Sequence, residues 1–340
     1  MAKKILNDPW DVVPELLEGV VAAYGGRVRQ LPGVSALVKT HLPPGKVGLL
    51  IGGGSGHEPL FPCFIGENMA DGAACGYVFA APAPDIILEA TRALDQGKGV
   101  LYLYGNYAGD NMNFDIAAEL AADEGIAVRT VRIWDDVASA PPDRVDERRG
   151  IAGDLLVIKI AGAVSASSDD LEEVVRITAK ARDNTRTIGV ALAAGSIPET
   201  GEPTFVLAED EIEIGMGLHG EPGVSCGKMM PADELVAKMM AAVLADLPFR
   251  EGDEVVLLVN DLGATTWMEL LIMARAAHRI LKEEGIPVYD TIIGSYCTCQ
   301  EMAGASITLT KLDEELKRYY DMPARSLGYT KVGHGERNPG

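Results

Sequence analysis

The stretch KVGLLIGGGSGHEP, Lys46–Pro59, joins a short apolar run to a loop rich in glycine. Aliphatic side chains in its first half are typical of a buried strand, and the glycines after it let the chain turn tightly. Other apolar runs of strand length follow along the chain. They cover residues 98–106, 127–134, 155–162, 187–194, 211–218, 254–261, 288–296 and 306–312. These runs predict a protein rich in buried β-strands.

Stretches of helical length separate most of these runs. Their apolar residues recur at three- and four-residue spacing, and several begin with a capping residue or end at a glycine. These stretches cover residues 83–97, 113–125, 169–183, 231–246 and 265–285. Such alternation predicts an α/β fold, with mixed or mostly parallel sheets flanked by helices.

The length of 340 residues exceeds the roughly 250 that one hydrophobic core usually serves, so we expect two domains. A charged helix ends near 181–187 and a new strand begins there, which places the boundary. The first α/β domain then covers 1–184, with the glycine loop, His57 and Asp110. The second covers 185–340 and carries His219. The pattern also allows C-terminal elements to pack back on the first domain.

Composition argues against several classes of function. A formal net charge of -20, without any Lys- or Arg-rich run, disfavours a nucleic-acid partner. No apolar run reaches the ~20 residues that span a bilayer, and the first residues lack a signal-peptide core, so we expect a cytoplasmic protein without a membrane partner. Five scattered cysteines fit a reducing compartment. Cys297 and Cys299 lack a second Cys/His pair nearby, which favours a structural role over zinc binding.

Candidate functional residues follow three of the expected strands. The glycine loop matches neither a Walker A loop nor G-x-G-x-x-G, so it predicts a site for a small polar ligand rather than a nucleotide. His57 follows this loop, and Asp110 follows the strand in LYLYGNYAGDNMNF, 101–114. Open α/β sheets bind ligands at the carboxyl ends of their strands. Asp110 is interpreted either as a helix N-cap or as a carboxylate that accepts a proton from a hydroxyl.

His219 lies among four glycines in IGMGLHGEPG, 214–223. It is interpreted either as an ordinary polar side chain or as a nucleophile, because a neutral imidazole nitrogen can attack a ketone carbonyl. No metal site is predicted. Asp135 and Asp136 are adjacent, and adjacent residues of a strand face opposite sides. His334, in the polar segment 333–340, is expected to be solvated.

Six segments together resemble one protein family. They are ILNDPWDVV, GGGSGHEP, NYAGDNMNF, IGMGLHGEPG, VNDLGAT and GSYCT. In this order they closely resemble the substrate-binding K subunit of dihydroxyacetone kinases. The resemblance implies two α/β domains, a homodimer and a phosphotransferase activity. It also implies that His219 binds the ketose carbonyl covalently as a hemiaminal, while His57 and Asp110 hold hydroxyls and assist phosphoryl transfer. Backbone groups of Gly53 and Gly54 would line the sugar site.

The phosphoryl donor is expected on another chain, because no P-loop and no kinase glycine-rich loop is present. The resemblance implies a separate L subunit that carries ADP or ATP with Mg²⁺, and no cofactor in this chain. A phosphotransferase-system protein recharges the bound ADP in one branch of the family, and ATP is used directly in another. The sequence leaves both open.

The family pattern is broken at the segment FAAPAPD, where relatives usually carry a serine before the proline. Here Ala80 and Ala81 stand there, and Ala81 is assigned to the substrate site. Gly105 likewise replaces a larger residue. Both changes enlarge the presumed site, so a four-carbon ketose such as erythrulose is the alternative substrate. A non-catalytic ketose-binding regulator, and an unrelated α/β enzyme that uses the same residues for acid-base chemistry, are the alternatives of other classes.

Overall fold

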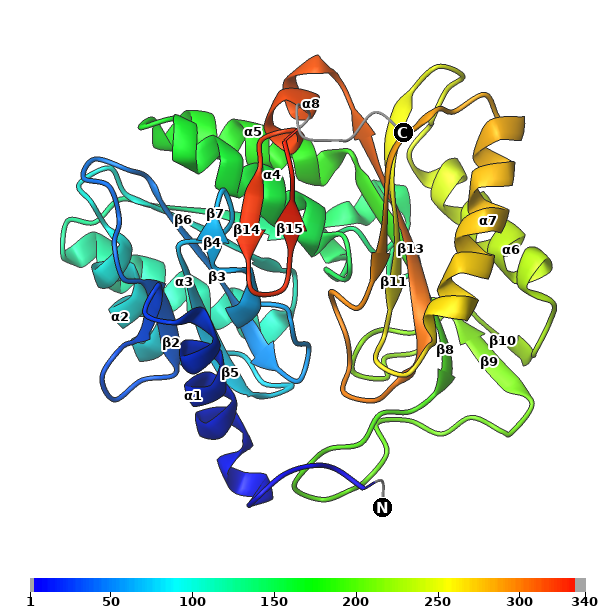
Figure 1. Cartoon of the computed structure of the whole chain (residues 1–340), viewed down its shortest axis with the longest axis horizontal. Helices are drawn as coiled ribbons and strands as arrows, with labels where there is room; N and C mark the ends of the chain where they lie inside the picture. Colours follow the sequence, from blue (N-terminus) through cyan, green and yellow to red (C-terminus); the bar gives the residue numbers. More distant parts are fainter. Residues whose placement is uncertain (1–2, 334–340) are drawn as a thin grey trace. The chain divides into compact units, whose positions relative to one another are not determined.

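A computed structural model describes residues 3–333, so the prediction for His334 lies outside the described residues. Its elements alternate between strands and helices along most of the chain (Figure 1). Two compact units can be distinguished. The first contains Ile5–Ile133, Leu155–Ala181 and the described residues from Glu314 onward. The second contains Trp134–Asp154 and Arg182–Asp313, together with Lys3 and Lys4.

A six-stranded mixed sheet forms the centre of the first unit, in the order β1-β2-β5-β3-β6-β7. Its strands are β1 (Val28–Gln30), β2 (Ala36–Lys39), β3 (Gly48–Ser55), β5 (Gly72–Val78), β6 (Val100–Gly105) and β7 (Val128–Ile133). β3 lies between β5 and β6 and runs parallel to both, and β6 runs parallel to β7. β1 and β2 are antiparallel additions at one edge. The carboxyl ends of the parallel strands therefore share one edge of the sheet.

Helices and short elements complete the first unit. The helices are α1 (Val12–Tyr24), α2 (Pro84–Leu94), α3 (Ala108–Asp123), α4 (Asp154–Ser167), α5 (Leu171–Asp183) and α8 (Glu314–Tyr320), with 3-10 turns at Pro9–Asp11 and Pro62–Phe64. A small sheet joins β4 (Gly66–Glu67), β14 (Ala324–Ser326) and β15 (Thr330–Lys331). α2 and α3 pack on one face of the main sheet around Leu50, Tyr102 and Phe114. Edge-to-face and stacked aromatic contacts of Phe114 fill this core.

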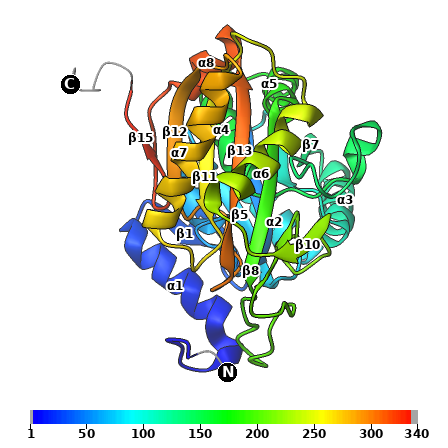
Figure 2. The same ribbon diagram turned by 90° about the vertical axis from the view of Figure 1, so that its right-hand side faces the viewer.

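The second unit also has a six-stranded mixed sheet, in the order β10-β9-β8-β13-β11-β12. Its elements are the 3-10 helix Pro142–Glu147, β8 (Thr185–Ala193), β9 (Glu211–Ile214), β10 (Ser225–Lys228), α6 (Ala232–Asp246), β11 (Glu254–Asp261), α7 (Trp267–Glu283), β12 (Val288–Gly294) and β13 (Ala303–Leu312). α6 and α7 lie side by side against this sheet (Figure 2) and bury Met239, Met240 and Leu270. Mixed sheets flanked by helices confirm the predicted fold class.

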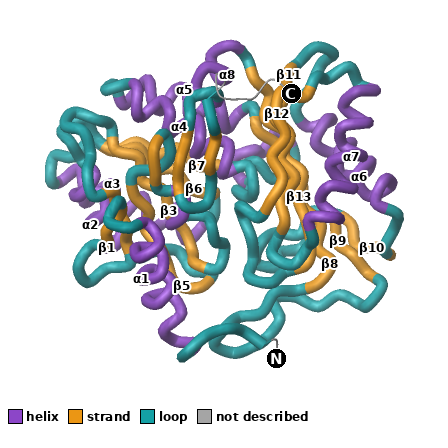
Figure 3. The backbone as a smooth tube through the Cα atoms, in the orientation of Figure 1, coloured by secondary structure: helices purple, strands orange, loops and turns teal. Residues whose placement is uncertain are grey.

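One predicted strand is wrong. Residues 155–162, LLVIKIAG, belong to α4, which is drawn as a helix in Figure 3. The residues of this run are buried on all sides, from Leu155 through Gly162. An unbroken apolar run has no polar face, so neither a period of 2 nor one of 3.6 can be read from it. The contacts around the helix, rather than its own pattern, decide its conformation.

The units are interleaved in sequence. The second unit resumes at Arg182, close to the predicted boundary at 184, and residues from Glu314 belong with the first unit. Residues 134–154 group with the second unit, although they precede the boundary. Division into domains 1–184 and 185–340 stays a prediction. Among residues 3–333, no helix has both the length and the apolar character needed to cross a membrane.

Buried ionic contacts hold residues 134–154 in the second unit. The guanidinium of Arg148 is fully buried and donates to Asp246, which also accepts from Arg186. The carboxylate of Asp135 accepts from the backbone N–H groups of Ile151 and Gly153, both at 2.8 Å. Removal of one partner of such a buried ion pair destabilises the fold, because the remaining charge stays buried without its partner.

A buried lysine lies inside the helix that the sequence assigned to a strand. Lys159 has no exposed surface, and its Nζ donates to the backbone carbonyl of Tyr319 at 2.8 Å. Burial lowers the pKa of Lys159 to about 7; the nearby charge of Lys331 lowers it further, and Asp321 opposes the shift. The folded chain therefore releases this proton near neutral pH.

We predict that Lys159→Met weakens the rise of stability with pH. Between pH 7 and pH 9 the unfolded chain keeps the lysine proton and the folded chain loses it. The free energy of unfolding of the wild type should therefore rise by about 2 kcal/mol more than that of the variant. Urea unfolding at both pH values measures this, with the exposed Lys282→Met as the control. Equal pH dependence in wild type and Lys159→Met would contradict the prediction.

Candidate functional site

Three loops meet at the carboxyl edge of the first unit's sheet, because β3, β5 and β6 are parallel neighbours. The loops after β3 and β5 carry His57 and Ala81, and the loop after β6 leads into α3, whose first turn carries Asp110. The backbone N–H of Phe79 donates to the carbonyl of Ser55 at 2.9 Å, and its ring lies 5.3 Å from that of His57. The loop after β5 is thereby fastened to the loop after β3.

The glycines of the loop are required by packing. A β-carbon on Gly53 would overlap the ring of Phe61, and one on Gly54 would lie 2.8 Å from the backbone nitrogen of Ala80. Gly56 has φ +99°, a conformation that favours glycine. Close approach of neighbouring protein atoms thus explains these glycines without a ligand. That the backbone of Gly53 and Gly54 also lines a ligand site stays a prediction.

His57 is 4% exposed, so it is nearly enclosed by protein. Next to it, the carboxylate of Glu58 accepts from the backbone N–H of Gly56 at 3.0 Å. Burial raises the pKa of Glu58, and the hydrogen bonds from the backbone oppose this rise. A small substrate in contact with an enclosed imidazole would exchange protons with it directly, since bulk water has little access.

Asp110 is the third residue of α3 and not its N-cap, which corrects one of the two interpretations. The N-cap is Tyr107, which has extended backbone angles. A carboxylate in the first turn interacts favourably with the positive end of the helix, which favours its ionised form. Asn111 donates to Asn106 at 2.8 Å and braces the turn before it. The start of α3 therefore presents a half-buried carboxylate that can accept a proton.

The start of α3 also adjoins the loop after β5. A β-carbon on Gly109 would lie 3.4 Å from the methyl group of Ala81, and Asn113 donates to the carbonyl of Pro82 at 2.9 Å. Ala81 thus faces the first turn of α3 at Gly109, the residue that precedes Asp110. This edge of the sheet brings together His57, Ala81 and Asp110 within one unit.

His219 lies in the second unit, in the loop between β9 and β10. Its Nδ1 is 3.1 Å from one carboxylate oxygen of Glu221, and its backbone N–H donates to the other oxygen at 2.9 Å. Burial raises the pKa of Glu221, but the hydrogen bond and the charge of His219 outweigh it and lower the pKa to about 2. Glu221 is therefore an ionised acceptor at neutral pH.

Arg149 continues this arrangement behind Glu221. Its Nη1 lies 3.9 Å from Glu221, its Nε donates to Asp136 at 3.0 Å, and its Nη2 donates to the carbonyl of Gly215 at 3.0 Å. A β-carbon on Gly217 would overlap both Glu221 and Arg149. Gly217 of the segment 214–223 must therefore lack a side chain for Glu221 and Arg149 to approach each other.

This geometry selects a tautomer of His219. An ionised carboxylate only accepts, so Nδ1 carries the proton and Nε2 carries the lone pair. The imidazole side chain is 26% exposed, which leaves part of it accessible to a small molecule. Sequence reasoning missed Glu221 and Arg149. The spacing His-Gly-Glu was available as a signal for Glu221, whereas Arg149 comes from a distant segment and left no such signal.

The other polar candidates have structural roles. Asp136 accepts from Arg149 and from the backbone N–H of Ala138, and Asp135 holds the turn at residues 151–153. Cys297 and Cys299 are buried free thiols, and burial raises the pKa of both. Within the described part of the chain, no group of three or more His, Cys, Asp or Glu side chains is suited to hold a metal ion.

A model of the Dak1 domain matches residues 18–328 of the chain. The PTS-dependent dihydroxyacetone kinase 2, dihydroxyacetone-binding subunit DhaK, of Listeria innocua is 42% identical over 97% of this chain and 99% of its own length. The L-erythrulose kinase of Pectobacterium atrosepticum is 37% identical over 99% of this chain, which corresponds to 57% of that protein.

Solved structures give the same picture. The dihydroxyacetone kinase of C. freundii in complex with AMP-PNP and Mg²⁺ matches with a TM-score of 0.89 and 30% identity, over 97% of this chain and 61% of that one. The dihydroxyacetone kinase operon co-activator Dha-DhaQ matches with a TM-score of 0.88 and 31% identity, over 94% of this chain and 99% of that one. The fold is therefore shared by proteins named as a kinase and as a co-activator.

We predict that Glu221→Gln removes the bias of His219 towards the tautomer with a proton on Nδ1. A neutral amide can donate as well as accept, so it no longer excludes the other tautomer. Nitrogen NMR of the labelled imidazole above its titration range measures the two populations. Glu209→Gln, an exposed change in the same unit, should leave them as in the wild type. Unchanged tautomer populations in Glu221→Gln would contradict this role.

Proposed function

The chain belongs to the Dak1 domain family, and we propose that it is the substrate-binding subunit of a ketose kinase. In this proposal His219 holds dihydroxyacetone by a reversible covalent bond, and a partner subunit delivers the phosphoryl group to a terminal hydroxyl. The observation that carries the proposal is the contact between His219 and Glu221, because it directs an unprotonated imidazole nitrogen away from the carboxylate. The similarity to a dihydroxyacetone-binding subunit over nearly the whole of both chains supports it.

Capture of the ketose is an addition to its carbonyl group. The Nε2 lone pair of His219 forms the C–N bond while the carbonyl π bond breaks, and the carbonyl oxygen takes up a proton to become a hydroxyl. The ring becomes positively charged as the bond forms. The carboxylate of Glu221, 3.1 Å from Nδ1, stabilises this charge and relays the Nδ1 proton to water, while water supplies the proton that the carbonyl oxygen takes up; overall one proton moves from the ring to the oxygen, and the hemiaminal is neutral. Glycerol has no carbonyl and is rejected.

A covalent bond suits so small a substrate. Dihydroxyacetone buries little surface, and the affinity available per atom from polar contacts is limited. The C–N bond fixes both position and orientation, which converts phosphoryl transfer into a reaction between groups already aligned. In the proposal Asp110 accepts the proton of the terminal hydroxyl as its oxygen attacks phosphorus. His57 holds a hydroxyl and assists the same transfer.

The donor belongs to a partner in this proposal. Similar proteins are named as subunits of multi-component kinases. An L-type subunit with ADP or ATP and Mg²⁺ would supply the phosphoryl group, because the chain's glycine loop matches no nucleotide-binding pattern. A phosphotransferase-system protein would recharge ADP where that nucleotide stays bound. We also propose that the chain acts as a homodimer in the cytoplasm.

Two observations favour alternative functions. Relatives named as erythrulose kinases, together with the small residue at Ala81, favour a four-carbon ketose. The co-activator Dha-DhaQ favours a ketose-binding regulator without catalysis. His57 follows β3, and Asp110 follows the neighbouring parallel strand β6. The presence of both residues supports the kinase, since a regulator needs no group to accept a hydroxyl proton.

Two variants separate capture from transfer. We predict that His219→Ala abolishes the adduct, so the carbonyl carbon of ¹³C-labelled dihydroxyacetone keeps its ketone or hydrate signal and gains no signal of a carbon bonded to nitrogen. Asp110→Asn should retain the adduct and lower kcat by roughly 100-fold or more, assayed with a cognate L subunit, because a general base contributes about that much. Retained transfer in both variants would refute the proposed function, and an adduct without transfer in the wild type would favour the regulator.

Substrate size is tested at the loop after β5. We predict that Ala81→Ser lowers kcat/KM for erythrulose relative to dihydroxyacetone by about tenfold, because the added hydroxyl occupies space beside the first turn of α3. The exposed Ala80→Ser is the matched control and should leave this ratio within about twofold. A wild-type preference for dihydroxyacetone that Ala81→Ser does not alter would contradict a four-carbon substrate.

A further inference from the structure

A cavity of about 850 Å³ lies in the first unit, at the edge of the sheet opposite to His57 and Asp110. It is formed where β2 ends and where β3 and β5 begin. Lys39 is the last residue of β2, Lys46 precedes β3, and Asp71 precedes β5. The C-terminal turn of α4 and the strand β14 complete its walls with Ser165 and Arg325. Its volume is within the range usual for small-molecule sites.

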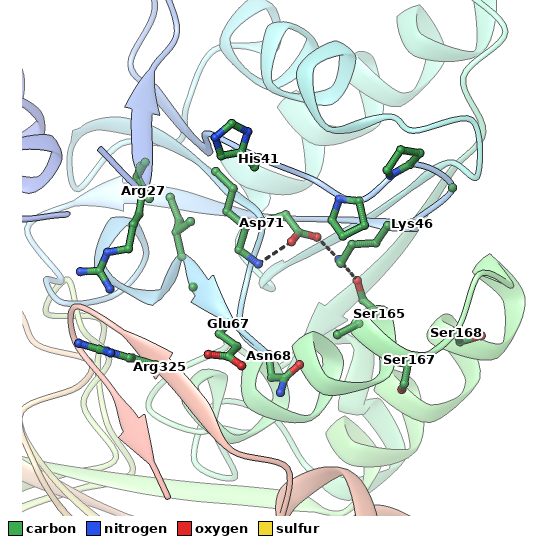
Figure 4. A pocket seen from close by; sticks show the side chains of 18 of the residues that line it. Arg27, His41, Lys46, Glu67, Asn68, Asp71, Ser165, Ser167, Ser168 and Arg325 are labelled. Atoms are coloured by element: carbon green, nitrogen blue, oxygen red, sulfur yellow. Dashed lines mark hydrogen bonds and ion pairs between the residues drawn. The ribbon is translucent and has the colours of Figure 1, made fainter. Parts of the chain in front are cut away.

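The floor of the cavity is a buried ionic cluster. Asp71 is fully buried and accepts from Lys39 at 2.7 Å, from Lys46, and from the backbone N–H of Leu49 at 2.9 Å. Lys46 also donates to the hydroxyl of Ser165 at 2.5 Å (Figure 4). Burial opposes the charge on Asp71, but the two lysines outweigh it and hold the pKa of Asp71 below its ordinary value. Two cations on one carboxylate leave this cluster positively charged.

Two arginines face the same cavity. In Figure 4 the guanidinium groups of Arg27 and Arg325 lie on the same side of the view, across from Lys46 and Ser165. Arg27 is held by a hydrogen bond from its Nε to the carbonyl of Tyr24 at 2.9 Å and by the Tyr24 ring, 5.7 Å from its guanidinium carbon. Within residues 3–333, neither arginine forms an ion pair with a carboxylate.

The negative groups of the lining offset only part of this charge. Asp169 is paired with Lys98 at 2.8 Å. Glu67 is exposed and lies opposite Arg325 in the register of β4 and β14, without an ion pair to it. The C-terminal turn of α4 adds a partial negative charge, which Lys46 faces. The positive charges of the lining are those of Arg27 and Arg325 and the one lysine charge that Asp71 does not neutralise. They outnumber the negative charge of Glu67, although the net charge of the chain is -20.

We propose that this cavity binds a small phosphate monoester. A phosphate monoester carries nearly two negative charges at neutral pH and three acceptor oxygens, which suits two planar guanidinium groups and the Lys39 ammonium. A single carboxylate would neutralise only one of these cations. The side chains of Val28, Ile65 and Pro44 line the same cavity and would cover the carbon skeleton of the ester. This site is separate from the proposed ketose site and does not depend on it.

Glycerol 3-phosphate is the probe that tests this site. It carries the phosphate ester but no carbonyl, so it cannot be captured by His219. Calorimetric titration of the full chain at fixed ionic strength should show binding of glycerol 3-phosphate, weaker binding of inorganic phosphate, and none of glycerol. The variant His219→Ala should bind glycerol 3-phosphate as the wild type does. Failure of the proposed kinase function would leave these results unchanged.

Two double variants with equal loss of charge distinguish a built site from general attraction. Arg27→Gln with Arg325→Gln should weaken glycerol 3-phosphate binding by about tenfold or more, since each guanidinium makes charge-assisted hydrogen bonds. Arg29→Gln with Arg318→Gln, outside the lining, should change it by less than about twofold. An equal loss in both pairs, or no binding up to about 10 mM, would overturn the site. Equal affinity for inorganic phosphate would overturn the assignment of an ester.

Discussion

The parallel pairing of β3 with both of its neighbours is the constraint on which the first unit depends. β3 can lie this close to β5 because Gly52 lacks a side chain. A β-carbon on Gly52 would lie 2.6 Å from the carbonyl oxygen of Ala74, and one on Gly53 would overlap Phe61. Parallel strands direct all their carboxyl ends to one edge and all their amino ends to the other. The polar loop residues and the cationic cavity therefore occupy opposite edges of one sheet.

Much of this arrangement could be predicted from local pattern. The glycine loop, the alternation of strands and helices, and the position of His57 and Asp110 after parallel strands all follow from apolar periodicity and turn residues. The failure at residues 155–162 is instructive, because a helix buried on every side carries no periodic signal. Asp110 as the third residue of α3, rather than its cap, depends on where the backbone of Tyr107 turns, and the sequence does not mark that residue.

Contacts between distant segments explain what sequence reasoning missed. Arg149 lies 3.9 Å from Glu221, although the two residues are 72 positions apart in the sequence. Neither Arg149 nor Asp136 belongs to a motif that suggests this contact. The sequence predicted no metal site at Asp135 and Asp136, but it did not indicate what these carboxylates bind. Their hydrogen bonds to the turn at 149–153 show that both carboxylates hold the chain instead. Buried acceptors of this kind are common, and composition alone does not separate them from functional carboxylates.

The proposed chemistry divides between the units in a way that follows from these contacts. Glu221 contacts His219 and is followed by Arg149, which binds Asp136 and the carbonyl of Gly215; these groups belong to the second unit. The contact that selects the nucleophilic tautomer therefore lies within the second unit. The groups assigned to the hydroxyl, His57 and Asp110, belong to the first unit, where His57 lies beside Phe79 and Asp110 lies in the first turn of α3. Orientation of the nucleophile and placement of the proton acceptor are therefore traced to different parts of the chain, the first to the loop between β9 and β10 and the second to the loop after β3 and the start of α3.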